Sequence, residues 1–368
     1  MRHFMGPQNQ FSLGASMASV STIVLSSGFL IGLVFGAVGL LSGFCVVSGL
    51  RNTWTKDDGR MIRSIALAVA VAILGTQGLS AFGYVDLTKS IYLAPTFSAP
   101  VVLLGGLMFG YGMVAANACA SRAMVLLGRG NLRSLVVIAT IAITAEMTLK
   151  GLIAPLRIAL VNWSQTTLGA VSLPAFVAQA GLDPSLAAGV AALAVAAALL
   201  AFAFSYAPFR ASKLLIATGL VMGGLVTAGW FVTGYIGADP FEPSPVASLT
   251  FIAPIADGLQ YVMLSTGSTL NFGIVVMAGV LAGSFLTALV TRSFHLEGYS
   301  SHNHMLRSVG GAALMGVGGV MAFGCSIGQG LTGLSTLALP SAIAVVGILI
   351  GAAVGLRSPA RVAALASA

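Results

Sequence analysis

The sequence predicts an all-α polytopic membrane protein, and three observations lead to this fold class. Hydrophobic residues make up 57% of the 368 residues, charged residues make up 7%, and the mean hydropathy is +1.00. A soluble protein carries about 25% charged residues. Apolar stretches of about 20 residues, long enough to cross a bilayer as a helix, recur along the chain. We find no long polar stretch, so residues 1–368 are expected to form a single transmembrane domain with no soluble domain.

Nine apolar stretches are long enough to be full crossings. They cover residues 18–45, 62–85, 99–121, 134–160, 185–206, 213–236, 271–291, 308–326 and 338–356. A weaker stretch at 248–264 contains Pro254 and Asp257 and is short for a full crossing. We therefore expect about nine transmembrane helices, accompanied by re-entrant or broken helices.

The basic residues predict the orientation of these crossings. They cluster in alternate loops, as Arg51, Lys56, Arg60 and Arg63, then Arg122, Arg129 and Arg133, then Arg210 with Lys213, Arg292 with Arg307, and Arg357 with Arg361. The intervening loops hold one basic residue, Lys89, and carry Asp86, Asp183, Asp239 and Glu242. Basic loops face the cytoplasm, so we expect a multi-pass protein of the inner (cytoplasmic) membrane, with its N-terminus outside and its C-terminus inside.

This orientation has two consequences. Residue 237 would lie outside and residue 292 inside, so the weak stretch 248–264 must enter and leave on the same side. The net charge of +8 lies in short loops between apolar segments, so it excludes nucleic acid as a partner and leaves membrane lipid as the surroundings.

Three cysteines occupy similar settings and mark an internal repeat. The preceding sequences are FGAVGLLSGFC, FGYGMVAANAC and MGVGGVMAFGC, which end at Cys45, Cys119 and Cys325. In each, a glycine lies nine residues before the cysteine, at Gly36, Gly110 and Gly316. Transporter folds are built from such repeats, and broken helices meet at their midplane. We expect pseudo-repeats over roughly 16–206 and 207–368.

The third cysteine lies in the run AFGCSIGQGLTGLST, residues 322–336, which predicts a broken helix. Glycines lower helix propensity, and polar side chains at membrane depth need partners. Irregular backbone at this depth is tolerated where it lines a cavity. The run is therefore expected to form one wall of a central substrate constriction.

Isolated thiols limit the chemistry that the cysteines can perform. The chain has no C-x-x-C pair, as a dithiol oxidoreductase would need, and no histidine at zinc-ligand spacing from a cysteine. We therefore predict no metal and no cofactor. A free cysteine is often a small buried hydrophobic residue. Three in equivalent positions favour a pathway for a soft, sulfur-bearing substrate.

Other candidate residues are fewer. Glu146 and Lys150 lie four residues apart within 134–160, where they either serve the substrate pathway or form a structural ion pair. His302 and His304 in SHNHM are interpreted as part of a solvated loop rather than as metal ligands. All four histidines lie outside the apolar cores, so a membrane serine protease is excluded. No ATP-binding motif is found, and we predict that the protein is not an enzyme.

Three runs resemble the YeeE/YedE family of sulfur-transport membrane proteins. They are GFCVVSGLRNTWTKDDGRMIRSIALAVAVA (43–72), NACASRAMVLLGRGNLRSLVVI (117–138) and GCSIGQGLTGLSTLALPSAIAVVGILIGAAVG (324–355). The resemblance implies an hourglass of pseudo-symmetric halves and thiosulfate uptake. It also implies that Cys45, Cys119 and Cys325 pass thiosulfate along by transient S–H···S hydrogen bonds. The neighbouring positions that match are Asn117, Ser121, Arg122, Ser326, Gln329 and Thr332.

The chain departs from the family pattern at Ala118 and Ala123, where we expect a glycine and a polar residue. Either change could alter the substrate. The resemblance allows a related sulfur or selenium cargo and a separate small cytoplasmic sulfur-carrier protein as a partner. Two alternatives remain open. Cys325 could transfer sulfur covalently through a reactive thiolate, or the chain could be a scaffold for a partner enzyme.

Overall fold

The fold, described by a computed structural model, is almost wholly helical over residues 7–167, 171–179, 181, 183–238 and 245–357. The α-helices are α1 (Pro7–Ser42), α2 (Val46–Lys56), α3 (Arg60–Ala81), α4 (Ala99–Ala115), α5 (Ala120–Gly128), α6 (Leu132–Leu149), α7 (Ala154–Trp163), α8 (Leu173–Ala178), α9 (Pro184–Phe204), α10 (Ala207–Arg210), α11 (Lys213–Phe231), α12 (Ile252–Met263), α13 (Phe272–Val290), α14 (His302–Met321) and α15 (Leu339–Arg357). Shorter elements are the 3-10 turns η1 (Leu87–Lys89) and η2 (Ile91–Leu93), the π-helical turns η3 (Val232–Ile236) and η4 (Gly328–Gly333), and strands β1 (Thr96–Phe97) and β2 (Thr166–Thr167).

Within the described residues, eight helical segments are long and apolar enough to cross a membrane. They correspond to eight of the nine expected crossings, and the fold is that of an all-α polytopic membrane protein. The remaining expected crossing, 308–326, contains most of α14, a helix of 20 residues that ends at Met321. Several glycines and a polar first turn make α14 less apolar than the other eight segments.

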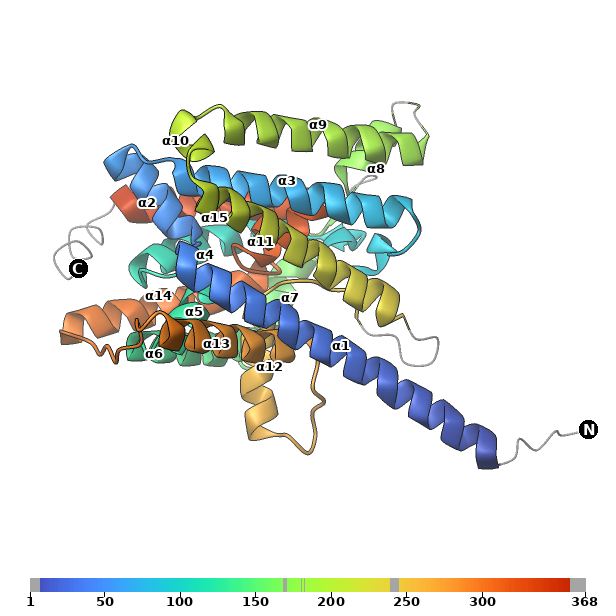
Figure 1. Cartoon of the computed structure of the whole chain (residues 1–368), viewed down its shortest axis with the longest axis horizontal. Helices are drawn as coiled ribbons and strands as arrows, with labels where there is room; N and C mark the ends of the chain where they lie inside the picture. The colour runs from blue at the N-terminus through green and yellow to red at the C-terminus, as the bar shows by residue number, and fades with distance from the viewer. Residues whose placement is uncertain (1–6, 168–170, 180, 182, 239–244, 358–368) are drawn as a thin grey trace, which may run out of the picture.

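Two expected elements differ in detail from the structure. The stretch 134–160 is not one helix, because α6 ends at Leu149 and Pro155 begins a new helix, α7, one turn later. Proline is favoured in the first turn of a helix. The weak stretch 248–264 forms irregular chain followed by α12, which crosses the main helix direction steeply (Figure 1).

Glycines allow the long helices to pack in close pairs, α1 with α13 and α4 with α15. Gly36 of α1 lies against the carbonyl oxygen of Val280, and Gly110 of α4 lies against that of Ile348. A methyl group at either glycine would be 2.2 Å or 2.1 Å from that oxygen. Small residues at such crossings are what membrane helices use to bring backbones together. Helices α3, α11 and α9 form a second layer, with α9 outermost (Figure 1).

Loops that are distant in sequence gather at the two ends of the bundle. At one end, Tyr206 Oη donates to the carbonyl oxygen of Asp57, and Asn131 Nδ2 donates to Glu297 Oε2. At the other end, β1 pairs with β2. Helix α1 starts and α15 ends at opposite sides of the molecule (Figure 1). Asp239, Glu242 and Arg361, which we used to predict the orientation, lie outside the described residues.

Candidate substrate pathway

Each cysteine follows a break between two helical segments. A residue with positive φ lies two positions before each of them, at Gly43 (67°), Asn117 (56°) and Phe323 (57°). Cys45 and Cys119 are the N-cap residues of α2 and α5, and Cys325 precedes η4. The left-handed residue ends one helix and redirects the chain, so that the thiol lies at the start of the next segment. The three breaks share this backbone pattern; the pseudo-repeats over roughly 16–206 and 207–368 stay a prediction.

Cys45 and Cys119 form a close pair of free thiols. Their sulfur atoms lie 3.8 Å apart, and the Ser121 hydroxyl lies 3.3 Å from Cys119 Sγ. Both side chains are buried, with at most 3% exposure. Either thiol can donate to the other, so the pair presents one weak donor and a polarizable sulfur surface.

Cys325 lies in a shell of backbone amides. The amide N–H of Gly328 donates to Cys325 Sγ at 3.2 Å, and the amides of Ile327 and Phe251 also interact with this thiol. The π-helical turn η4 follows, and turns of this kind are often found at functional sites.

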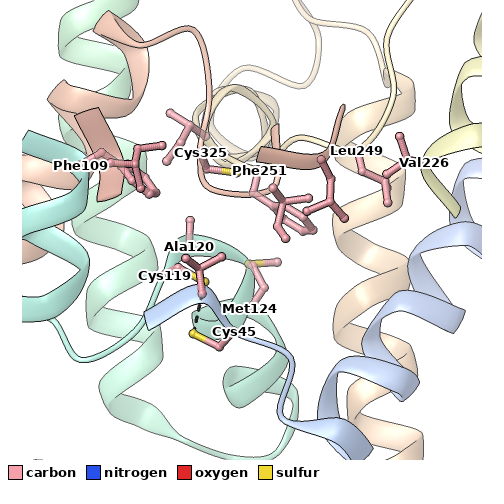
Figure 2. Packing of buried hydrophobic residues seen from close by; sticks show 14 of the residues in the cluster. Cys45, Phe109, Cys119, Ala120, Met124, Val226, Leu249, Phe251 and Cys325 are labelled. Atoms are coloured by element: carbon pink, nitrogen blue, oxygen red, sulfur yellow. Dashed lines mark hydrogen bonds between the residues drawn. The ribbon is translucent and has the colours of Figure 1, made fainter. Parts of the chain in front are cut away.

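Figure 2 shows the thiols in two tiers. Cys325 lies with Phe109, Phe251 and Leu249, whereas Cys119 and Cys45 lie together below them. Phe109 and Phe251 are fully buried, and the rings of Phe35 and Phe251 pack with centroids 5.2 Å apart. All three thiols belong to one buried apolar cluster. The tier that holds Cys325 is therefore tightly packed above the cysteine pair.

Three buried polar atoms in the segments that follow Cys325 have no hydrogen-bond partner. Ser326 Oγ, Gln329 Oε1 and Ser341 Oγ are all buried in this way. Gly333 lies close to two of them, because a methyl group there would be 2.3 Å from Ser341 Oγ and 2.7 Å from Gln329 Oε1. Buried polar atoms nearly always have partners. These exceptions call for an explanation, and a bound ligand would supply one.

The remaining residues implied by the family resemblance support the breaks. Gln329 Nε2 donates to the carbonyl oxygen of Ala322 at 2.5 Å, and Thr332 Oγ1 donates to that of Leu249 at 2.6 Å. Arg122 Nη1 donates to the carbonyl oxygen of Gly39 at 2.9 Å. Asn117 is exposed and accepts a hydrogen bond from Arg51.

Glu146 and Lys150 lie away from the thiols, in contact with α12. Lys150 Nζ lies 3.4 Å from Glu146 Oε1, 3.7 Å from Asp257 Oδ1 and 2.5 Å from Gln260 Oε1. The open pocket that they line contains no cysteine. This geometry favours the alternative of a structural ion pair, which joins α6 to α12.

The interpretation of SHNHM as a solvated loop is wrong for His304. Both histidines belong to the first turn of α14, where His302 is exposed but His304 is 9% exposed. The cause is helical geometry, because residues two apart face different sides of a helix. Among the described residues, no three His, Cys, Asp or Glu side chains gather as metal ligands.

Two small pockets are lined by residues that lie close in sequence to Cys325 or to Cys119. One, of about 20 Å³, is lined by Tyr92, Phe323 and Gln329 among others. The second, of about 80 Å³, is lined by residues that include Asn117, Ala118 and His304. Neither pocket is lined by a cysteine. The described structure thus separates both pockets from the thiols.

Sequence reasoning missed the segment around Leu249 and Phe251. Its residues contact Cys325 and accept the hydrogen bond from Thr332. The signal was present in the short stretch 248–264, because a re-entrant element must end among the buried helices. The pattern alone does not identify which residues meet a thiol.

Buried, thiol-bearing breaks between the helices of a polytopic bundle are the arrangement expected of an integral membrane transporter. Comparison with known proteins gives the same class and a narrower assignment. The model of the Sulphur transport family matches residues 41–354, and the chain belongs to this family.

Curated relatives match most of the chain. The thiosulfate transporter TsuA of Escherichia coli is 23% identical over 345 residues, which cover 89% of this chain and 92% of the relative. The thiosulfate transporter TsuA of Spirochaeta thermophila is 26% identical over 338 residues, covering 88% and 96%. The probable transporter YedE of Salmonella typhimurium is 31% identical over 95 residues, covering 26% of this chain and 22% of the relative. The predicted resemblance is confirmed, and the protein is a transporter rather than an enzyme.

Proposed function

We propose that this protein carries thiosulfate, or a closely related sulfur anion, across the membrane along a pathway that contains Cys325, Cys119 and Cys45. The names of the two full-length relatives support the cargo. The observation that carries the proposal is the buried pair of free thiols, with sulfur atoms 3.8 Å apart, beside a third buried thiol. The anion would move by transient S–H···S hydrogen bonds, without a covalent intermediate.

The chemistry of the thiols suits an anion with a soft sulfur end. A thiol is a weak donor, so it offers a contact without a strong trap. Conduction needs sites that bind well enough to admit a substrate and weakly enough to release it. The amides around Cys325, together with the Ser326 hydroxyl, could serve the charged oxygen end. Thr332, Gln329, Asn117, Ser121 and Arg122 would hold the broken segments in place.

The packed tier around Phe251 would act as a barrier in this pathway. Neither pocket is lined by a cysteine, and Phe251 and Phe109 are fully buried at the level of Cys325 (Figure 2), so movement of these rings would open the way to the lower thiols. Phe251 is the last residue of the short segment 245–251 and directly precedes α12. The Lys150 ion pair would position α12. Glu146 and Lys150 therefore enter the proposal as positioning residues.

Uptake of ³⁵S-thiosulfate by the purified full chain in liposomes tests the proposed cargo. Thiosulfate should accumulate above the level of protein-free liposomes, and unlabelled thiosulfate should compete more strongly than sulfate. An absence of uptake, with folded protein in the liposomes, would exclude thiosulfate as the cargo.

The alternative is covalent transfer of sulfur through Cys325, and the hydrogen bond from the Gly328 amide to Cys325 Sγ, which would stabilise a thiolate, gives a reason to test it. In a covalent mechanism the cysteine thiolate would attack the outer sulfur of thiosulfate, break its S–S bond and release sulfite, so the cysteine should gain the mass of one sulfur atom. The proposed pathway predicts unmodified thiols by intact-protein mass spectrometry, even while uptake proceeds.

The remaining parts of the proposal, the orientation in the membrane and a partner protein, rest on the loops. Gathering of the basic loops at one end supports an inner-membrane protein with its N-terminus outside and its C-terminus in the cytoplasm. A separate small sulfur-carrier protein would meet the protein at that basic end. Reporter fusions at the two termini test the orientation, because a cytoplasmic reporter should be active only at the C-terminus.

A further inference from the structure

We infer that the pocket between the α5–α6 turn and the start of α14 is a second binding site, which takes a tetrahedral sulfur oxyanion on the basic-loop side of the thiols. The pocket has a volume of about 80 Å³ and is lined by Asn117, Arg133, Ser134, His304 and Ser308, among others. The inference rests on the proposed function for the identity of the anion.

The position of the pocket joins it to the pathway. Ala116, Asn117 and Ala118 line it, and the next residue in the chain is Cys119. Asn117 has a φ of 56°, so the break that presents the thiol also forms the pocket wall. An anion released by the Cys45–Cys119 pair would meet this pocket next.

His304 supplies the main observation for a ligand. It is 9% exposed, and its buried Nδ1 atom has no hydrogen-bond partner. The Tyr299 ring packs edge-on against the imidazole, with centroids 5.4 Å apart, and the His304 amide donates to Ser301 Oγ. The ring is thus held in place by its neighbours, while one nitrogen is left for another group. Buried polar atoms rarely lack partners.

The charges around the pocket favour an anion as the group that binds the free nitrogen of His304. The positive charges of Arg307 and Arg133 act on His304. None of the residues that line the pocket is acidic. Glu297 contacts the wall through Asn131, but its carboxylate is also paired with His295. The Ser308 hydroxyl adds a neutral donor to the pocket lining, whereas the Ser134 hydroxyl already donates to Asn131 Oδ1 at 3.4 Å.

The thiols and the pocket would recognise different ends of the substrate. The thiols contact the soft sulfur end and bind it weakly, whereas the pocket would bind the oxygen end. Several sites of moderate strength in sequence favour conduction over trapping. The pocket would therefore set how fast the anion leaves the basic-loop side.

Equilibrium binding to a protein without cysteines tests the inference. The full chain carrying Cys45→Ala, Cys119→Ala and Cys325→Ala is placed in phosphatidylcholine nanodiscs, and binding of ³⁵S-thiosulfate is measured. We expect saturable binding that sulfate displaces, because both anions share an oxyanion end. Adding His304→Gln should weaken binding about tenfold or more, since a hydrogen bond to a charged group is lost.

His302→Gln is the matched control, because His302 lies on the same helix turn but is exposed and outside the pocket. Its affinity should equal that of the parent. Ser308→Ala, a small change at a second pocket residue, should also weaken binding; it carries the test if His304→Gln does not give monodisperse protein.

Three results would overturn the inference. The first is no saturable binding by the protein without cysteines. The second is equal affinity in the His304→Gln or Ser308→Ala protein and the His302→Gln protein. The third is loss of binding when phosphatidylglycerol is added, which would identify a lipid headgroup as the occupant. Uptake that is independent of the cysteines would contradict the proposed function, yet leave the His304-dependent binding intact.

Discussion

At the scale of single residues, the three thiols depend on three backbone positions with positive φ. Glycine tolerates this conformation at Gly43, and asparagine does so moderately at Asn117. Phe323 is a bulky residue in a conformation that is rare for its type. Strain of this kind persists where the surrounding structure enforces it, and it clusters at functional sites.

Thr332 is the residue that ties the segment carrying Phe251 to η4. Its hydroxyl donates to the carbonyl oxygen of Leu249 at 2.6 Å in a buried setting. Thr332→Val keeps the shape but leaves that carbonyl oxygen without this partner, so we expect a loss of about 1–3 kcal/mol in the free energy of unfolding and reduced uptake. Thr332→Ser retains the hydroxyl and should behave like the native chain. Equal stability of the two variants in detergent unfolding would contradict this role.

At the scale of elements, the close pairs α1–α13 and α4–α15 fix the positions of the helices that end at the breaks. Gly110→Ala would put a methyl group 2.1 Å from the carbonyl oxygen of Ile348, so α4 and α15 must separate. We expect a loss of about 1–3 kcal/mol in the free energy of unfolding, as for other overpacked contacts. Gly224→Ala is the control, because a methyl group there meets nothing within 4 Å. Similar unfolding curves for both variants would argue against a close α4–α15 contact.

The ion pair of Lys150 is expected to couple α6 to α12. Lys150→Met leaves Glu146 and Asp257 without their shared positive partner, so α12 should loosen. The second change Asp257→Asn should then recover part of the loss. The measurement is a double-mutant cycle on the free energy of unfolding, with an expected coupling of about 0.5 kcal/mol or more. Strictly additive effects would show that the two side chains do not interact.

Glu297 gives the contact between the loops at 129–133 and 293–298 a dependence on pH. The His295 hydrogen bond lowers the pKa of Glu297, and the positive charges of Arg133 and Arg129 lower it further. Because the pKa of Glu297 is lower in the folded state, its ionised carboxylate stabilises the fold at pH values above the unfolded-state pKa of about 4.3. This contribution is lost as the pH falls through the folded-state pKa. The effect is at most about 1 kcal/mol, because the pair is partly exposed.

Melting temperatures of the native chain and of Glu297→Gln, measured at pH 7 and pH 4, check this dependence. The variant should melt slightly lower at pH 7, and the difference should shrink at pH 4. A gap that widens on acidification would reverse the assigned sign.

At the scale of the whole molecule, most of the fold could be predicted from composition and from the charge of the loops. They were sufficient for the membrane class and for eight crossings, because apolar length alone decides whether a helix can span a bilayer. The break after Leu149 was missed because Pro155 lies within an otherwise apolar run. The burial of His304 was missed because the sequence did not indicate that a helix begins at His302, and residues two apart on a helix face different sides.

The candidate site was predicted only in part, for a related reason. Cysteine spacing and glycine content identified the breaks that carry the thiols. The 3.8 Å approach of Cys45 to Cys119 and the packing of Phe251 beside Cys325 depend on contacts between distant segments. Spacing along one chain does not fix such contacts, so the cysteine pair appears only in the folded molecule.

The most direct test of the account is ³⁵S-thiosulfate uptake in cells that lack other thiosulfate transporters, compared for the native chain and for single changes at each thiol. We predict that Cys325→Ala and Cys119→Ala each lower uptake about tenfold or more, with normal amounts of folded protein in the membrane. Ser64→Ala, a buried change that removes a hydroxyl from α3, controls for general damage to the fold. Uptake at the native level in either the Cys325→Ala or the Cys119→Ala protein would contradict the thiol pathway.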